Sequence, residues 1–383
     1  MTVFSRLSSF AALALLAALP AHAFETAATH AWVYDITTNT VLLDKNGDEP
    51  VPPASMSKLM TVEMLFEALQ EGRVQMDTTF GVSARAVSFT AMGGSTMYLQ
   101  QGDRPTVQEL IQGMIVNSGN DACTVVAEGL EGSEEEFARK MTDRAHVLGL
   151  KDSYFANSSG WPDPGQRMSM HDLGMLSVHI IETYPNLYST FAETDYNYKN
   201  RSPANANNRN PLLKLGIGAD GLKTGHTEEA GYGMVGSVKQ GERRIVFAFN
   251  GVTSDKSRAQ EAERMANWAF RQFALKTVVR AGTEITRADV FLGDAAKVGL
   301  VSDRDLRLLI PAGVGNDIDA EVVYSGPITA PVAKGTKLGE LVIKMPEMSD
   351  QHVDMLAASD VGKAGFVDRV MVAFTDLLNR YGV

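Results

Sequence analysis

The sequence contains a single cysteine, Cys123, among its 383 residues. One thiol cannot form a disulfide within its own chain, and it cannot build a cysteine-based metal cluster. The 7 histidines are scattered, and none belongs to an H-E-x-x-H pattern, the signature of many zinc hydrolases. We therefore expect no metal and no other cofactor, although histidine and carboxylate ligands far apart in the sequence could still meet in the fold.

Basic runs are also missing. Lys and Arg number 35 against 46 Asp and Glu, so the formal net charge is −11. An acidic chain without a basic patch lacks the electrostatic attraction that binds phosphate backbones, and we expect no nucleic-acid partner. The composition, 44% hydrophobic and 21% charged, is that of a globular protein and excludes disorder. The length allows two or three domains.

The N-terminal apolar run, from Phe10 to Leu19, is too short to cross a bilayer, which needs roughly 20 apolar residues. It follows one base, Arg6, and precedes the sequence Pro-Ala-His-Ala, which ends at Ala23. This pattern predicts a secretory signal peptide over residues 1–23, with a buried N-terminal helix as the alternative. A lone cysteine suits the oxidising compartment that such an exported protein reaches.

The periodicity of apolar residues predicts alternating helices and hairpins up to about Ala274, and short β-rich runs separated by Gly, Pro and Asp turns beyond it. The second pattern is typical of a small β-sandwich or barrel. We therefore divide the chain into residues 1–23, 24–274, 275–362 and 363–383. The expected helices include 59–69, 107–116, 133–148 and 258–272, the expected hairpins are 31–44 and 232–250, and the expected loops are 157–165 and 200–210.

A short motif, Ser55-Met56-Ser57-Lys58, stands at the start of the first expected helix. Residues three apart lie on one helix face, so the Ser55 hydroxyl and the Lys58 amine can meet. Serine becomes a nucleophile when a base takes its proton. A neutral lysine can be that base if burial and a nearby cation lower its pKa. Alone, the motif is also compatible with a surface lysine one turn after a serine.

A second motif, Ser118-Gly119-Asn120, lies between two expected helices. Its hydroxyl can pass a proton and its amide can hold a carbonyl group of a substrate. A helix cap also explains a serine and an asparagine at such a place.

The third motif is Lys223-Thr224-Gly225, which is followed by His226 and a glycine-spaced strand. A lysine and a hydroxyl on a strand edge can bind a carboxylate, and the small Gly225 lets a substrate backbone approach closely. A β-turn with an exposed lysine is the alternative.

Taken in order, the three motifs resemble those of the penicillin-binding proteins and serine β-lactamases. The middle motif is Ser-Gly-Asn instead of Ser-Asp-Asn, which resembles the low-molecular-weight penicillin-binding proteins that are D-alanyl-D-alanine carboxypeptidases. The resemblance extends over the blocks 53–61, 117–122, 220–227 and 230–232 and covers essentially the whole chain after residue 23. It implies an α+β fold, with an antiparallel sheet flanked by helices, followed by a small all-β sandwich domain and a C-terminal amphipathic helix.

The resemblance also implies a role for each motif residue. Ser55 would be the acylated nucleophile, Lys58 its base, and Ser118 the residue that relays a proton to the leaving D-alanine. The backbone N–H groups of Ser55 and His226 would form the oxyanion hole. The implied substrate-binding residues are Asn120, Lys223, Thr224, Gly225, His226, Arg209 and Arg258.

Several of these residues have plainer explanations. Arg209 and Arg258 could be surface arginines in polar segments. Asp172 matches a carboxylate that flanks the site in the family, but capping of the helix that follows explains it equally well. Cys123, just after the second motif, fits a buried structural thiol better than a reactive one.

The resemblance implies a serine D,D-carboxypeptidase that removes the terminal D-alanine from peptidoglycan pentapeptides ending in D-Ala-D-Ala. Penicillins and other β-lactams mimic that dipeptide and would trap Ser55 as an ester. A class A β-lactamase would need a loop glutamate, and there is none between Asn157 and Asp172. An endopeptidase that cuts peptide crosslinks with the same residues stays open as an alternative. A scaffold that has lost catalysis is another, but the presence of all the motif residues argues against it.

The last segment, from Gly365 to Val383, has apolar residues that step by three and four and charged residues on the other side. Such a helix can pack on the domain before it, or lie in a membrane interface. Gly362 and Gly365 separate it from that domain, and the family it resembles is held by such a tail on the periplasmic face of the inner membrane. We therefore expect an exported, periplasmic protein attached peripherally to the inner-membrane surface.

Overall fold

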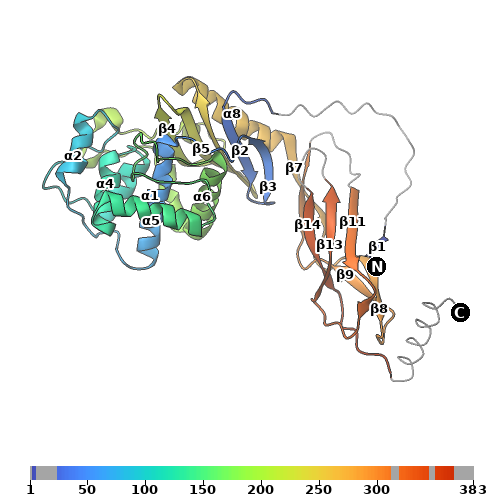
Figure 1. Cartoon of the computed structure of the whole chain (residues 1–383). Helices are drawn as coiled ribbons and strands as arrows, with labels where there is room; N and C mark the ends of the chain where they lie inside the picture. Colours follow the sequence, from blue (N-terminus) through green and yellow to red (C-terminus); the bar gives the residue numbers. More distant parts are fainter. Residues whose placement is uncertain (1, 6–23, 312–318, 345–349, 366–383) are drawn as a thin grey trace. The chain divides into compact units, whose positions relative to one another are not determined.

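The computed structural model describes residues 2–5, 24–311, 319–344 and 350–365 (Figure 1). By its internal contacts the chain divides into two compact units, and the division falls after Phe270. The sequence places it after residue 274. Each unit is described by itself below.

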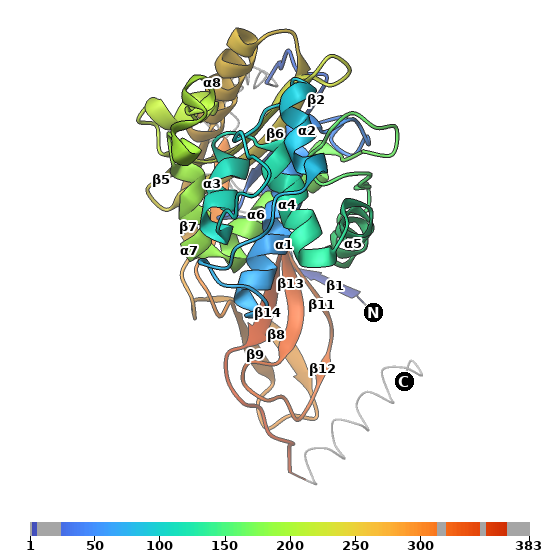
Figure 2. The same cartoon turned by 90° about the vertical axis from the view of Figure 1, so that its left-hand side faces the viewer.

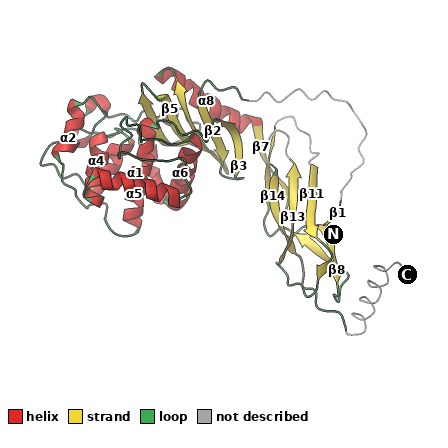
Figure 3. Ribbon diagram, viewed as in Figure 1, coloured by secondary structure: helices red, strands yellow, loops and turns green. Residues whose placement is uncertain are grey.

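The first unit is built on a five-stranded antiparallel sheet in the order β3-β2-β6-β5-β4. Figure 3 shows this sheet in yellow, with helices drawn in red beside it. The two hairpins that the sequence predicts are β2–β3 and β5–β6, and β4 pairs with β5 and forms one edge of the sheet. The strand bounds are β2 His30–Asp35, β3 Thr40–Lys45, β4 Ala219–Thr227, β5 Gly231–Gln240 and β6 Arg243–Val252.

The two faces of this sheet pack against different helices because successive side chains of a strand point to opposite faces. Trp32 and Ala248 pack with the helices α1 to α7, whereas Val33 and Phe247 belong to the core under helix α8 (Asp255–Gln272). The unit therefore has three layers. The other bounds are α1 Lys58–Gln70, α2 Ala84–Ala91, α3 Val107–Ile115, α4 Asn120–Glu131, α5 Glu134–Val147, α6 Met170–Thr183 and α7 Pro185–Tyr188.

Short 3-10 turns link these helices to the sheet, and three of them lie in or beside residues 200–210, which the sequence predicts to be a loop. Figure 2 shows the helical layer that these turns connect, with α1, α3, α4 and α6 near its centre. The turns are η1 Ala54–Ser57, η2 Ser189–Ala192, η3 Tyr198–Asn200, η4 Pro203–Asn205 and η5 Pro211–Lys214.

Helix starts follow capping chemistry. The Ser133 side chain accepts the Glu136 N–H at 3.2 Å, as the Ser-x-x-Glu spacing suggests. Glu136 does not return the bond, because its carboxylate pairs with Arg139. The reciprocal pair forms instead at the start of α3, between Thr106 and Glu109.

The second unit is β-rich. One sheet has the order β1-β11-β13-β14-β9-β8-β12, and β7 and β10 form a separate pair. Side chains from both sheets share one apolar core, including Leu308, Val322, Ile343 and Met355. The bounds are β1 Thr2–Ser5, β7 Phe273–Val279, β8 Glu284–Phe291, β9 Lys297–Val301, β10 Leu306–Pro311, β11 Asp319–Ser325, β12 Ile328–Thr329, β13 Lys337–Lys344 and β14 Gln351–Ala357.

The predicted fold class is thus confirmed for the α+β unit and the β-rich unit. The expected C-terminal helix falls mainly on residues 366–383, which lie outside the described residues. Within the described ranges, no helix combines the length and apolar character needed to cross a bilayer.

A buried ion pair joins the layers of the first unit. The Arg243 Nε of β6 lies 2.9 Å from the Asp35 Oδ2 of β2, and the Asp35 side chain is fully buried. A second nitrogen of the same guanidinium donates to the Ala269 carbonyl of α8 at 3.1 Å. Two strands and the helix that covers them therefore meet at one side chain.

We predict that Arg243→Met lowers the free energy of unfolding by about 3–5 kcal/mol, because it leaves the Asp35 carboxylate buried without its counter-charge. Urea unfolding followed by circular dichroism measures this loss. The control is Arg139→Met, which removes two exposed ion pairs on α5, with Glu136 and Asp143, and should change the free energy of unfolding far less. Equal losses for both variants would contradict the prediction.

Candidate active site

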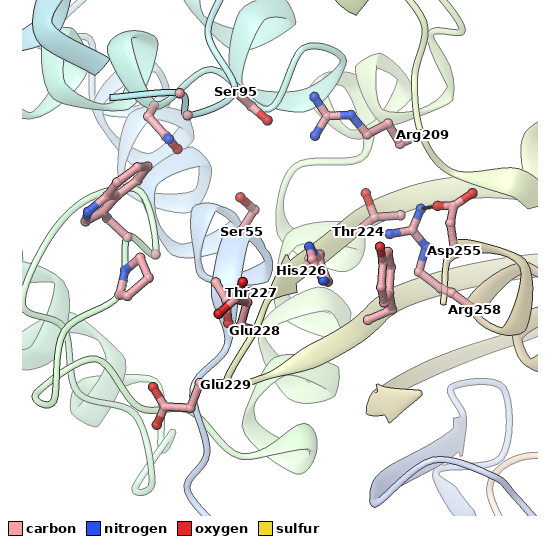
Figure 4. A pocket seen from close by; sticks show the side chains of 18 residues that line it. Ser55, Ser95, Arg209, Thr224, His226, Thr227, Glu228, Glu229, Asp255 and Arg258 are labelled. Carbon is pink, nitrogen blue, oxygen red and sulfur yellow. Dashed lines mark hydrogen bonds and ion pairs between the residues drawn. The ribbon is translucent and has the colours of Figure 1, made fainter. Parts of the chain in front are cut away.

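A cavity of about 890 Å³ lies where the edge strand β4 meets the η1 turn and the loops beside it. Figure 4 shows Ser55 in the middle of this cavity, with Arg209, Thr224 and Arg258 to one side of it. The lining residues are Ser55, Gly93, Gly94, Ser95, Asn120, Gly160, Trp161, Pro162, Arg209, Thr224, Gly225, His226, Thr227, Glu228, Glu229, Tyr232, Asp255 and Arg258.

The expected meeting of Ser55 and Lys58 is present. Ser55 lies on η1, the turn that leads directly into α1, and the Lys58 Nζ is 2.9 Å from the Ser55 Oγ. Two glycines allow other segments to press against this turn. A Cβ at Gly225 would lie 3.1 Å from the Pro53 carbonyl oxygen. One at Gly160, whose φ is +77°, would lie 1.9 Å from the Ala54 carbonyl oxygen.

The Lys58 amine has two more partners, the Asn120 Oδ1 at 2.7 Å and the Ser159 carbonyl at 2.6 Å. Both of these oxygens can only accept, whereas the Ser55 hydroxyl can also donate. A neutral amine has two N–H groups and one lone pair. Its two N–H groups match the two carbonyl-type oxygens, which leaves the lone pair aimed at the Ser55 O–H.

The electrostatics favour that neutral form. Lys58 is fully buried, and burial, together with the positive charge of Arg209, lowers its pKa to about 8. Its ordinary pKa is 10.5. At pH 7 about one tenth of the amine is therefore neutral, and this fraction grows as the pH rises through about 8, which provides the neutral form that a general base requires.

Lys223, which the sequence suggests as a substrate-binding residue, is buried, is not among the residues that line the cavity, and donates to the Thr224 carbonyl at 3.0 Å. Burial lowers its pKa well below the ordinary value, and the charges of Lys58 and Arg209 act in the same direction. The charged form of Lys58 thus disfavours the charged form of Lys223. A substrate carboxylate at Thr224 would reverse this effect for Lys223.

Ser118 adopts a left-handed backbone conformation, with φ +57°, and its buried hydroxyl has no hydrogen-bond partner within the described parts of the chain. The peptide groups after it are held firmly. The Gly119 N–H donates to Gly113 at 2.9 Å, and the Asn120 N–H donates to Ser95 at 2.8 Å. Helix α4 begins at Asn120 without a side-chain cap. The helix-cap explanation of this motif therefore finds no support.

The two arginines also line the cavity. Arg258 is buried, pairs with Asp255 and lies over the Tyr232 ring at 5.7 Å. Arg209 is exposed at the cavity wall and donates to the Asn117 carbonyl at 3.3 Å. Neither is an unattached surface arginine. His226, which is exposed, stacks on Tyr232 with 3.8 Å between ring centroids.

Two other residues take structural positions. Asp172 is buried, accepts the Asp152 N–H and the Ser153 hydroxyl, each at 2.8 Å, and does not line the cavity. Its own N–H bonds the capping Ser169 at 3.0 Å, so it fastens a loop to the start of α6. Cys123 is fully buried, and burial raises its pKa to about 12, so it stays a thiol.

Sequence reasoning missed several parts of the site. Trp161 and Glu228 line the cavity, and the Ser159 carbonyl bonds Lys58. The aromatic Trp161 in a Gly- and Pro-rich loop could have been recognised in the sequence as a candidate site residue. The Ser159 carbonyl could not, since every residue has a main-chain carbonyl.

Residues 17–253 match the family described as D-alanyl-D-alanine carboxypeptidase, and residues 273–363 match the C-terminal domain of penicillin-binding protein 5. The chain belongs to the D-alanyl-D-alanine carboxypeptidase family. It is 32% identical to the D-alanyl-D-alanine carboxypeptidase DacF of Bacillus subtilis, over 86% of this chain and 85% of that protein.

Solved structures agree with this assignment. Penicillin-binding protein 5 from Haemophilus influenzae matches with a TM-score of 0.76 and 30% identity, covering 88% of this chain and 98% of that one. Penicillin-binding protein D2 from Listeria monocytogenes, solved in an ampicillin-bound form, matches with a TM-score of 0.55 and 27% identity, over 63% of this chain and 97% of that one.

In the described part of the chain, no group of three or more His, Cys, Asp and Glu residues is placed to hold a metal ion.

We predict that acylation by a penicillin speeds up as the pH rises through about 8 and then levels off, because the Lys58 amine must be neutral to accept the Ser55 proton. Stopped-flow acylation rates between pH 6 and pH 10 measure the profile. Lys58→Arg should abolish acylation across this range, because a guanidinium keeps its proton. A rate that is flat with pH, or normal acylation of the Lys58→Arg variant, would contradict the assignment of the base.

Proposed function

We propose that the protein is a serine D,D-carboxypeptidase that removes the terminal D-alanine from peptidoglycan stem peptides through an acyl-enzyme on Ser55, and that penicillins inhibit it. The observation that carries the proposal is the 2.9 Å contact between the Ser55 Oγ and a buried lysine whose other two partners only accept. This arrangement provides a nucleophile and its base in one place, within a family that the sequence comparisons establish.

Acylation begins when the Ser55 Oγ attacks the carbonyl carbon of the D-Ala-D-Ala peptide bond. The hydroxyl proton moves to the neutral Lys58 amine, and the negative charge on the carbonyl oxygen is stabilised by backbone N–H groups of Ser55 and His226. When the intermediate collapses, the C–N bond breaks and the amine of the leaving D-alanine takes a proton. The unpartnered Ser118 hydroxyl is suited to pass that proton on from Lys58.

Deacylation uses the same groups. Once the proton has left with D-alanine, Lys58 is neutral again and can take a proton from a water molecule that attacks the ester. Ser55 then recovers its own proton as the C–O bond breaks. The loop beside the cavity has no glutamate between Asn157 and Asp172 for this task, and we assign it to Lys58, whose amine contacts the Ser55 Oγ.

The charges around the cavity orient the substrate. Arg209, Thr224 and Arg258 lie on one side of Ser55 in Figure 4, which suits a terminal carboxylate. A peptide bound along the edge strand β4 would place the penultimate residue over Ser55. The carboxylate that penicillins carry beside their reactive amide would use the same side of the cavity.

We predict that Ser55→Ala abolishes both penicillin labelling and D-alanine release, since no other hydroxyl contacts the Lys58 amine in the described chain. Mass spectrometry after incubation with penicillin and a D-alanine assay with a pentapeptide measure the two losses. The control is Ser177→Ala, which removes a buried hydroxyl of α6 that bonds the Leu173 carbonyl, away from the cavity wall. Labelling of the Ser55 variant would refute the assignment.

We propose further that the protein is exported and attached to the periplasmic face of the inner membrane. The support is in the sequence: an A-x-A-ended apolar segment over residues 1–23 and an amphipathic segment after Gly365. Signal cleavage would remove β1, an edge strand whose pairing partner among the described residues is β11. The remaining strands keep their own pairings.

We predict that truncation before Gly365 releases active enzyme into the soluble fraction of cells. The attachment of the full chain should resist high salt, because the segment's charges nearly cancel and apolar burial provides the affinity. Fractionation with D-alanine release in each fraction measures the outcome. Aggregation or unfolding of the truncated protein would mean that the segment belongs to the fold.

A further inference from the structure

One asparagine side chain connects three segments that carry groups of the site. The Asn205 Nδ2, at the end of η4, donates to the Thr96 carbonyl at 3.0 Å and to the Asn117 carbonyl at 2.9 Å. The Asn205 Oδ1 accepts a hydrogen bond from Arg209. Thr96 follows Ser95, a lining residue, and Asn117 immediately precedes Ser118.

The chemistry of these contacts selects an amide. Two of the three partners are carbonyl oxygens, which can only accept, and the third is a guanidinium, which can only donate. A side chain that satisfies all three needs an N–H₂ group and an acceptor oxygen on one short stem. Aspartate lacks the donors, and alanine lacks both ends.

The contact is reciprocated. The Asn117 Nδ2 donates back to the Asn205 carbonyl at 2.7 Å and to the Tyr196 carbonyl at 2.9 Å. Asn117 is fully buried, and its own carbonyl also accepts from Arg209 at 3.3 Å. The guanidinium of Arg209 is thus held between the side chain of Asn205 and the peptide group just before Ser118.

We propose that Asn205 is a positioning residue that fixes the Arg209 guanidinium relative to Ser118. This rests on the proposed function, in which Arg209 receives the terminal carboxylate and Ser118 passes a proton at the bond being broken. The terminal carboxylate and the nitrogen of the bond being broken belong to the same D-alanine, so the distance between them is fixed. The Arg209 guanidinium and the Ser118 hydroxyl must therefore keep a fixed separation. Hydrogen bonds from one rigid amide to both segments maintain it.

The segment itself is anchored elsewhere. Asp103, which lies in the turn before α3, pairs with Lys199 at 2.8 Å and with Arg201. Loss of the Asn205 side chain therefore leaves the segment attached to the rest of the unit. What changes is the placement of Arg209.

The test is a double-mutant cycle with Asn205→Ala and Arg209→Ala in the full-length protein. We expect Asn205→Ala to lower kcat/KM for D-alanine release by roughly 10- to 100-fold, since small misplacements of a binding group have effects of this size. In the Arg209→Ala background the same substitution should change kcat/KM less than about 2-fold. Additive losses in the cycle would overturn the proposal, because they would mean that Asn205 does not act through Arg209.

Two aspartate variants separate the effect of losing the Asn205 amide from the effect of adding a negative charge. Asn205→Asp keeps the size and the contact with Arg209 but loses both donated bonds, and it should lose activity as Asn205→Ala does. Asn207→Asp adds the same charge two residues on, at an exposed side chain, and should keep kcat/KM within about 2-fold. Equal activity of the two aspartate variants would overturn the proposal. So would unfolding of both Asn205 variants, judged by circular dichroism, because Asn205 would then serve the fold.

The wild-type protein separates this proposal from the proposed function. Absence of D-alanine release by the wild type would refute the carboxypeptidase assignment. The same cycle would then be measured on second-order rates of penicillin acylation, because penicillins also carry a carboxylate. Coupling between Asn205 and Arg209 in those rates would uphold the positioning role, and additivity would reject it.

Discussion

The burial of the Lys58 amine is the constraint on which the rest of the site depends. A lysine in water holds its proton and cannot activate a serine. Here the amine is enclosed by segments that arrive from distant parts of the sequence, including the loop that carries Ser159. The Asn157 side-chain oxygen accepts the N–H groups of Ser159, Gly160 and Trp161 at 2.8–3.1 Å. This turns the Ser159 carbonyl towards Lys58, while Gly160 lets the loop close over η1.

Burial is not the only factor that sets the protonation state of the Lys58 amine, because nearby charges also act on it. The positive charge of Arg209 disfavours the proton of Lys58 while the cavity is empty, and the charges of Lys58 and Arg209 disfavour the charged form of Lys223. A bound carboxylate would neutralise part of that field, and it would favour the charged form of Lys223 first, since this residue adjoins Thr224. The substrate's own charge is therefore part of the electrostatic balance that sets the base.

Much of this arrangement could be predicted from the sequence. The i,i+3 spacing of Ser55 and Lys58 and the alternation in β5 and β6 are local patterns, so they predicted the pair and the hairpin correctly. The cavity's far wall could not be predicted in this way. Trp161 reaches it through a loop without periodicity, and Asn205 acts through contacts with carbonyl groups, which every residue has. At the start of α5 the Ser133 side chain caps the helix, but Glu136 does not complete a reciprocal pair, because its carboxylate pairs with Arg139.

The backbone around Ser118 is hydrogen-bonded while the side chain, within the described residues, is not, and this contrast prepares the site for substrate. Around Ser118 the neighbouring peptide groups are bonded to Gly113, Ser95 and Asn205. The Ser118 hydroxyl has no bond within the described residues, although it is buried, and its backbone adopts a conformation that costs energy for a non-glycine residue. Unmade hydrogen bonds of buried groups are unfavourable, typically by about 1–3 kcal/mol. A substrate amine that hydrogen-bonds the Ser118 hydroxyl recovers this energy at the atom through which the proton must move. The unpartnered hydroxyl therefore lowers the stability of the free protein but favours substrate binding and proton transfer.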